Sequence, residues 1–208
     1  MNSKNRVQWV YSSRDNKELE DRYDRWANDY DKDLEKDFAY RAPRVAAEYF
    51  AKYVPTEARI LDAGAGTGLV GKVLTEMGYS NLIAMDMSQG MLQEARKKSV
   101  YKELHRMVMG EKLDFDSDSF DAVICVGTLT LGHAPASSLN ELVRITKPTG
   151  HIVYTLRPDI YEEKGFKEIH NELESAGEWK LVEASEEIQV LPKGEPDIYH
   201  QVWVYQII

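Results

Sequence analysis

The stretch Ile60-Leu-Asp-Ala-Gly-Ala-Gly-Thr-Gly68 decides how the rest of the sequence is interpreted. Its first four residues are typical of a short buried strand, and glycines then occupy every second position up to Gly68. Glycines placed in this way let the backbone adopt dihedral angles closed to other residues and approach a ligand closely. A merely tight turn needs one or two glycines, so the loop indicates a nucleotide-type ligand.

Three nucleotide-type ligands use such loops, and the spacing of the glycines distinguishes them. The dinucleotide pattern requires a third glycine three positions after Gly66, where Leu69 stands. The phosphate-loop pattern matches from Gly66 to Lys72, but Val73 replaces the serine or threonine that binds magnesium, so a nucleotide hydrolase is the less favoured alternative. S-adenosylmethionine has no pyrophosphate and therefore does not require the dinucleotide glycine placement.

An acidic residue ends the next predicted strand, Leu82-Ile-Ala-Met-Asp86. Asp86 follows Gly66 by 86 − 66 = 20 residues, the separation expected of a carboxylate that reaches ribose hydroxyls. A solvent-facing aspartate at a strand end is the alternative. The loop and the acid together favour a ribose-containing cofactor.

Beyond the glycine loop, strand and helix patterns alternate. Strands are predicted at residues 82–86, 107–109, 121–126 and 150–156, and helices near 68–78, 88–99, 135–147 and 161–176. Such alternation predicts crossover units on a parallel sheet. In residues 179–190 and 200–207, apolar and polar residues partly alternate, which predicts an antiparallel hairpin that closes one edge of the sheet. Upstream of the loop, residues 18–54 have helical spacing.

Composition limits the class of protein and its partners. The 208 residues are 43% apolar, which suits one globular domain, and the formal net charge of −9 disfavours nucleic acid and anionic membranes as partners. No secretory signal or membrane-spanning run is evident, so we expect a cytoplasmic protein.

The one cysteine, Cys125, excludes an intrachain disulfide and a multi-thiolate metal site, and we expect it to be buried in a strand. His170 and His200 lack metal-ligand spacing, so no metal is expected.

Four segments in order resemble the class I S-adenosylmethionine-dependent methyltransferases, over about residues 20–157. They are the glycine loop, Met85-Asp-Met-Ser-Gln-Gly-Met-Leu92, Phe120-Asp-Ala-Val-Ile124 and Leu142-Val-Arg-Ile-Thr-Lys-Pro-Thr-Gly150. Within that superfamily, residues 23–31, 40–44 and 126–132 most resemble the Williams–Beuren syndrome region methyltransferase-like group. The narrower resemblance implies the same cofactor but no substrate.

The resemblance implies a fold and a domain organisation. We expect an α/β, Rossmann-like three-layer sandwich whose seven-stranded, mostly parallel sheet has a reversed last strand. A single methyltransferase domain over residues 1–208 would comprise an N-terminal helical cover (1–55), a cofactor-binding core (56–157), and a helix with a C-terminal β-hairpin (158–208).

The loop, Asp86 and the resemblance together predict the residues that bind S-adenosylmethionine and its product S-adenosylhomocysteine. These are Tyr30, Arg41, Asp62, Gly64, Ala65, Gly66, Gly68, Asp86, Met87, Gly110, Glu111, Val126 and Gly127. Tyr30 and Arg41 are placed at the methionine end by resemblance. Many relatives bind the adenine amino group with an aspartate where this chain has Met109. We therefore expect the carboxylate of Glu111 to accept from that amino group and the backbone N–H of Gly110 to donate to the adenine ring. Tyr23 and Trp26 are pocket candidates whose alternative is helix packing.

Methyl transfer from a sulfonium is an in-line displacement, so positioning is expected to supply most of the catalysis. His133 lies just after the predicted central strand and is the candidate general base, with a helix cap or an exposed position as alternatives. We expect a methyltransferase that modifies an oxygen or nitrogen of a small molecule. The alternative is a cofactor-binding protein without transfer activity that acts through interaction. A protein substrate stays open, and the sequence does not indicate the oligomeric state.

Overall fold

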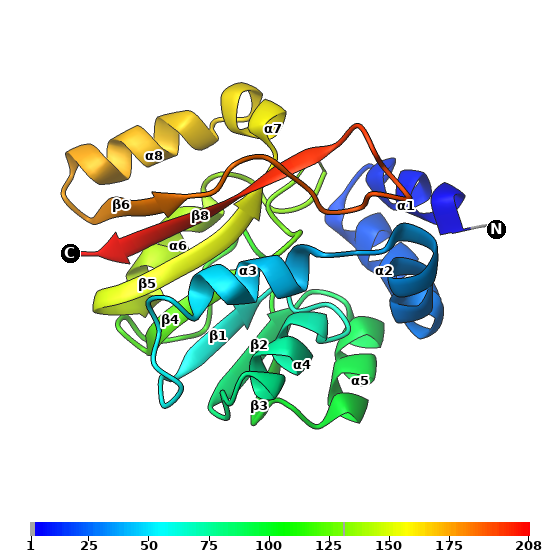
Figure 1. Cartoon of the computed structure of the whole chain (residues 1–208), viewed down its shortest axis with the longest axis horizontal. Coiled ribbons are helices and arrows are strands. Elements are labelled where there is room, and N and C mark those ends of the chain that lie inside the picture. The colour runs from blue at the N-terminus through cyan, green and yellow to red at the C-terminus, as the bar shows by residue number, and fades with distance from the viewer. Residues whose placement is uncertain (1–2, 131) are drawn as a thin grey trace.

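The computed structural model describes residues 3–130 and 132–208, which form a central mixed sheet with helices on both faces (Figure 1). Met1 and Asn2, at the start of the predicted cover, and Leu131, in the segment 126–132, lie outside the described residues. The strands are β1 (Ile60–Ala63), β2 (Leu82–Asp86), β3 (Glu103–Arg106), β4 (Phe120–Cys125), β5 (Thr146–Leu156), β6 (Trp179–Ala184), β7 (Ile188–Gln189) and β8 (Tyr199–Ile207).

The strand order is β3-β2-β1-β4-β5-β8-β6, with β7 paired to β8. Strands β1 to β5 are parallel, whereas β8 runs antiparallel between β5 and β6. The predicted mostly parallel sheet with its reversed last strand is therefore confirmed, but over the described residues the sheet has eight strands instead of the predicted seven, because the short β7 also pairs with β8. Because β2 and β4 flank β1 on opposite sides, the strand order changes direction at β1, where open α/β sheets bind their ligands.

Helices cover both faces of the sheet, which explains why apolar and polar residues do not alternate along its central strands. Ile60 packs in one core cluster with residues of α3 (Ala42–Phe50) and α4 (Leu69–Glu76). Its neighbour Leu61 packs in the other cluster with α6 (Ser138–Ile145) and α8 (Phe166–Ser175). Every residue of β1 is buried as a result. Cys125 is fully buried in β4, as predicted.

The N-terminal helices α1 (Ser3–Tyr11) and α2 (Asn16–Lys32) lie beside the end of the sheet toward which the parallel strands point (Figure 1). Asp15 caps α2 by accepting the N–H of Glu18 at 2.8 Å. A six-residue π-helical segment, η1 (Asp33–Phe38), follows α2 directly and ends at Ala39, whose φ is 53°. The predicted helical region upstream of the glycine loop is confirmed, and its π-helical break was not anticipated.

Several predicted bounds were wrong. The strand predicted at 107–109 lies earlier, at β3, because Glu103–Arg106 pairs with the end of β2. The helix predicted at 135–147 is the shorter α6, after which β5 begins immediately. The helix predicted at 161–176 is two helices, α7 (Pro158–Glu163) and α8, separated near Gly165 with φ 80°. The remaining core helix, α5 (Gln89–Lys98), matches its prediction.

Candidate cofactor and active site

The glycine loop leaves β1 in a conformation that only glycine adopts readily. Gly64, Gly66 and Gly68 have φ angles of 75°, 54° and 87°. A Cβ on Gly64 would lie 2.1 Å from Oγ1 of Thr128, so the loop packs tightly against the segment after β4. A Cβ on Gly66 would meet nothing within 4 Å, because that side of the loop is open. The loop therefore presents its backbone to open space beside β1.

Asp86 connects the end of β2 to this loop. Its Oδ2 accepts the N–H of Gly66 at 2.8 Å, and its Oδ1 accepts the N–H of Ser88 at 2.9 Å. Burial raises the pKa of the Asp86 carboxyl to about 6, although these backbone N–H groups oppose the rise. The carboxylate is thus fixed in orientation at the point where β1 and β2 diverge.

Asp62 has a different environment from Asp86. Its side chain is only 1% exposed, and its Oδ2 accepts a hydrogen bond from the hydroxyl of Tyr101, which also accepts the N–H of Gly71. Burial raises the pKa of the Asp62 carboxyl to about 7. Asp62 therefore ties β1 to α4 through Tyr101, behind the loop.

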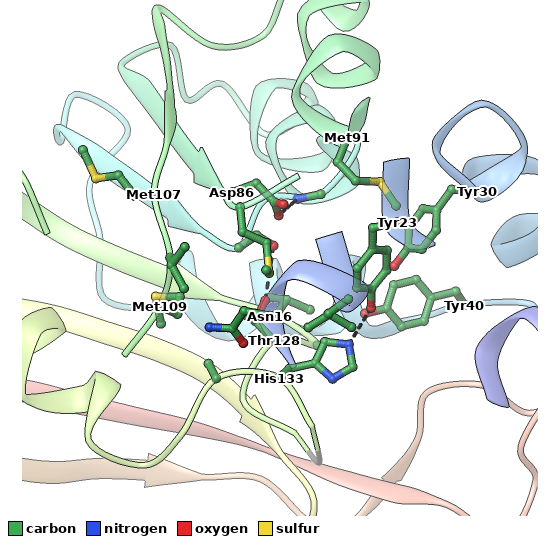
Figure 2. A pocket seen from close by; sticks show the side chains of 18 residues that line it. Asn16, Tyr23, Tyr30, Tyr40, Asp86, Met91, Met107, Met109, Thr128 and His133 are labelled. Atoms are coloured by element: carbon green, nitrogen blue, oxygen red, sulfur yellow. Dashed lines mark hydrogen bonds between the residues drawn. The ribbon is translucent and has the colours of Figure 1, made fainter. Parts of the chain in front are cut away.

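A cavity opens in front of the loop and is called the first cavity here. About 710 Å³ of it is free of protein atoms, and part of that space is open to solvent. Its lining residues come from α2, the segment after η1, the glycine loop, β2, α5 and the segments that follow β3 and β4 (Figure 2). They are Asn16, Leu19, Tyr23, Tyr30, Tyr40, Gly64, Gly66, Asp86, Met87, Met91, Met107, Val108, Met109, Val126, Gly127, Thr128, His133 and Ala134.

Apolar side chains dominate the part of the first cavity near Asp86. Met87 follows Asp86 directly, and Met107, Val108 and Met109 line the cavity after β3 ends. This explains why residues 107–109 were wrongly predicted to form a strand: this apolar run lines a cavity and does not pair with a neighbouring strand. The predicted adenine contacts shift accordingly: Gly110 and Glu111 do not line the first cavity, whereas the three residues before them do.

His133 faces the cavity in a hydrogen-bonded pair with Tyr23 of α2. The Tyr23 hydroxyl lies 2.7 Å from Nε2 of His133 (Figure 2), and the ring of Tyr11 packs edge-on against the imidazole. Burial raises the pKa of Tyr23 well above its ordinary value, so the phenol keeps its proton at neutral pH. The pair joins the N-terminal helices to the segment that follows the central strand.

Two aspartates fasten α2 over the first cavity. Asp24 accepts hydrogen bonds from Oγ of Ser88 at 2.6 Å and the N–H of Gly90 at 2.7 Å, at the start of α5. Asp31 pairs with Lys98 at 2.6 Å and accepts the hydroxyl of Thr67 in the glycine loop. The helix is therefore attached to the same elements that carry the loop and Asp86.

The structure brings together most of the residues predicted from sequence. Tyr30, Gly64, Gly66, Asp86, Met87, Val126, Gly127 and His133 all line the first cavity. Asp62, Ala65, Gly68, Gly110 and Glu111 lie outside its lining, and Arg41 is exposed at the start of α3. The residue before Arg41, Tyr40, lines the cavity in its place.

Sequence reasoning missed residues that only the folded chain brings to the cavity. Asn16, Leu19 and Met91 occupy helical positions that are typical of caps and packing. Tyr40 follows the π-helical turn, whose geometry determines which residue faces inward. The one available signal was its place directly before the predicted Arg41.

Two findings concern metals and membranes. Within residues 3–130 and 132–208, no group of three or more histidine, cysteine, aspartate or glutamate side chains has an arrangement that could hold a metal ion. In the same part of the chain, every helix is too short or too polar to cross a bilayer.

Comparison with known proteins identifies the family. Residues 61–154 match the methyltransferase domain family, a segment that contains the glycine loop, Asp86 and β4. A SAM-dependent methyltransferase from Thermotoga maritima superposes with a TM-score of 0.62 at 20% identity, over 89% of this chain and 97% of that one. Residues 61–154 are therefore a methyltransferase domain, and the chain has the fold of the class I S-adenosylmethionine-dependent methyltransferases, as its motifs indicated.

Two relatives are similar in sequence. Methyltransferase-like protein 27 of Homo sapiens is 37% identical over 165 residues, which are 76% of this chain and 66% of that protein. A ubiquinone biosynthesis O-methyltransferase of Alkalilimnicola ehrlichii is 36% identical over 101 residues, 47% of this chain and 40% of the relative. The chain therefore spans just under two thirds of the first relative and two fifths of the second.

The cofactor of this family is S-adenosylmethionine, and the residues of the first cavity fit it. The open side of Gly66 gives a ligand room to contact the loop backbone. Asp86 offers a fixed carboxylate of the kind that binds ribose hydroxyls. The methionines of the lining supply apolar, adaptable surface for a purine ring.

Proposed function

We propose that the chain binds S-adenosylmethionine in the first cavity and transfers its methyl group to an oxygen or nitrogen of a small-molecule acceptor. One observation carries the proposal: a single cavity extends from the glycine loop and Asp86 to the Tyr23–His133 pair. A cofactor-binding end and a proton-accepting group are therefore joined in one space.

The lining residues have distinct roles in holding the cofactor. Asp86 accepts hydrogen bonds from the ribose hydroxyls, and Gly64 and Gly66 let the chain backbone lie against the ligand. Met87 and the segment 107–109 cover the adenine ring, while Tyr30, Val126 and Gly127 lie along the methionine end. When bound, the cofactor supplies a methyl carbon that a lone pair attacks while the carbon–sulfur bond breaks and the sulfur keeps the bonding electrons.

The chain itself contributes alignment, exclusion of water and proton transfer. Helix α2 closes the cavity from one side, which limits water near the reacting atoms. A hydroxyl acceptor must lose its proton as it attacks, and His133 is the base within the cavity. Tyr23 orients the imidazole through the 2.7 Å hydrogen bond and can pass a proton to Nε2 while it receives one from the acceptor.

The class of acceptor is inferred from the shape of the site. The candidate site lies inside a cavity that α2 and its two aspartate contacts partly cover, which favours a compound small enough to enter whole. One relative is named as an O-methyltransferase of ubiquinone biosynthesis, which is consistent with a small acceptor.

Calorimetry and an acceptor screen test the proposal. S-adenosylhomocysteine and S-adenosylmethionine should both bind the wild-type chain, and release of S-adenosylhomocysteine with a panel of hydroxyl and amine compounds should identify an acceptor. Failure of both ligands to bind would refute the proposed function. Binding without turnover on any acceptor in the panel would favour the alternative, a cofactor-binding protein that acts through interaction.

A further inference from the structure

A second cavity adjoins the first and has not been assigned a role so far. About 550 Å³ of it is free of protein atoms, part of which is open to solvent. Its lining comes from α1, α2, η1, the segment after β4 and the chain around residues 190–200. The lining residues are Val7, Val10, Tyr11, Tyr23, Trp26, Tyr30, Leu34, Tyr40, Gly127, Thr130, Val190, Leu191 and His200. Tyr23, Tyr30, Tyr40 and Gly127 also line the first cavity, so these residues form a shared boundary.

Two buried polar atoms of the second cavity lack hydrogen-bond partners. Thr130 is 8% exposed and His200 is 9% exposed, and both line the cavity. Neither Oγ1 of Thr130 nor Nδ1 of His200 has a partner among the described residues. Buried polar groups are nearly always hydrogen-bonded in folded proteins, so these two atoms pair with water or with the polar group of a ligand that enters the cavity.

Aromatic rings form much of the wall. Trp26 and Tyr30 meet edge to face with ring centroids 4.8 Å apart, and Tyr23 meets Tyr30 in the same way at 6.3 Å. The indole N–H of Trp26 already donates to Asp33 at 2.8 Å, so its ring rather than its polar atom is available to the cavity. Such walls suit a flat ring, which packs well by stacking or edge contact.

The lining carries no formal charge at neutral pH. Burial lowers the pKa of His200 to about 4, which leaves the imidazole neutral. Arg157 and Asp159, whose charges act on His200, pair with each other at 2.6 Å. Glu195 is not a lining residue, but its charge raises the pKa of Tyr11, and burial raises the pKa of Glu195 itself. A charged ligand would therefore lose its hydration without gaining a counter-ion from the lining.

We propose that the second cavity binds the methyl acceptor, an uncharged small molecule with a planar ring that carries a hydroxyl or amino group. The inference rests on the proposed function, because it places the acceptor beside the cofactor across the shared boundary. The ring packs among the tyrosines, and a polar substituent pairs with Thr130 and His200. The nucleophilic oxygen or nitrogen then faces Gly127 and Tyr23, and a hydroxyl proton passes through Tyr23 to His133.

Fluorine NMR on the full chain saturated with S-adenosylhomocysteine tests the inference at neutral pH. The probes are para-fluorophenol and para-fluoroaniline as uncharged rings, para-fluorobenzoate as an anion and para-fluorobenzyltrimethylammonium as a cation. We expect the uncharged probes to bind more tightly than both charged ones. Preferential binding of the cation would overturn the assignment in favour of an aromatic cage for ammonium groups.

Two substitutions remove the unpaired polar atoms. Thr130→Val and His200→Phe should each weaken binding of the uncharged probes by about tenfold or more, a change equivalent to about 1.4 kcal/mol. Affinity for S-adenosylhomocysteine should stay within about twofold, which shows that each variant is folded. Thr75→Val, at an exposed position of α4, is the matched control and should change neither affinity.

The outcomes separate the inference from the proposed function. If S-adenosylhomocysteine fails to bind the wild-type chain, the proposed function is refuted and the acceptor site with it. If S-adenosylhomocysteine binds but the uncharged probes do not, or if Thr130→Val binds them as well as wild type, the acceptor site alone is refuted. Thr130→Val decides the matter even if His200→Phe does not fold, because valine has nearly the same shape as threonine.

Discussion

Asp86 holds both carboxylate oxygens against backbone N–H groups at the end of β2. Asp86→Ala should lower affinity for S-adenosylhomocysteine tenfold to a hundredfold, because hydrogen bonds to a charged group contribute about 1.5 to 3 kcal/mol. Calorimetry measures the change, with Asp116→Ala at an exposed position as the control. Unchanged affinity in a folded Asp86→Ala protein would rule out the ribose assignment.

Asp62 gives the stability of the protein a distinctive pH dependence. Burial raises the pKa of this carboxyl from an ordinary value of 3.8 to about 7, so the folded state binds the proton more tightly than the unfolded state. Its stabilising contribution is therefore complete below about pH 4 and is lost as the pH rises through about 7. Asp62→Asn removes this titration and keeps the size of the side chain.

Urea denaturation at about pH 5 and about pH 8 measures this effect. When the pH is raised from about 5 to about 8, wild type loses the contribution of Asp62 and Asp62→Asn does not. The unfolding free energy of the variant minus that of wild type should therefore rise by on the order of 1 to 3 kcal/mol. A difference between variant and wild type that does not change with pH would contradict the raised pKa of Asp62.

His133 is the predicted base, and its contact with Tyr23 gives that prediction a structural test. His133→Ala should lower turnover at least about tenfold with nearly unchanged cofactor affinity, because general-base catalysis contributes about 10² to 10⁴ in rate. Before an acceptor is known, the ring can be titrated by NMR with and without S-adenosylhomocysteine. If the chemical shifts and the titration curve of the His133 ring are the same with and without the ligand, His133 does not belong to the site.

Helix α2 lines the first cavity, and we propose that it covers the bound cofactor. Its attachment depends on Asp24 and Asp31, which contact α5 and the glycine loop. Hydrogen exchange of residues 18–44 should slow when S-adenosylhomocysteine is added, because the ligand fills the space that α2 closes. Asp24→Ala should raise exchange in α2 at least about tenfold without ligand, whereas Asp21→Ala, on an exposed face of the same helix, should not. Equal exchange with and without ligand would contradict the cover.

The elements that sequence predicted well are those whose own residues determine them. The residues from Ile60 to Gly68 by themselves predict a buried strand and an open glycine loop, and residues 122–125 of β4 show the continuous burial of a covered central strand. The segment 107–109 misled the prediction because apolar residues that line a cavity have the same pattern as a buried strand. Local periodicity does not distinguish the two.

At the scale of the whole molecule, the second cavity depends on segments that are far apart in the chain. Tyr11 belongs to the first helix, Thr130 follows β4, and His200 is the second residue of the last strand. From sequence, His200 was considered only as a metal ligand, because nothing near it in the chain indicates that it lies beside Tyr11 and Thr130. Tertiary contacts create this part of the candidate site, and the same contacts position Tyr40 in place of Arg41.

A crystal structure of the complex with S-adenosylhomocysteine tests the central claim most directly. We expect the ribose hydroxyls within hydrogen-bond distance of the Asp86 carboxylate, the adenine ring against residues 107–109, and the sulfur facing the shared boundary at Gly127 and Tyr23. A ligand bound outside the first cavity, or one with its adenine ring at Gly127 and its methionine end at Asp86, would contradict it.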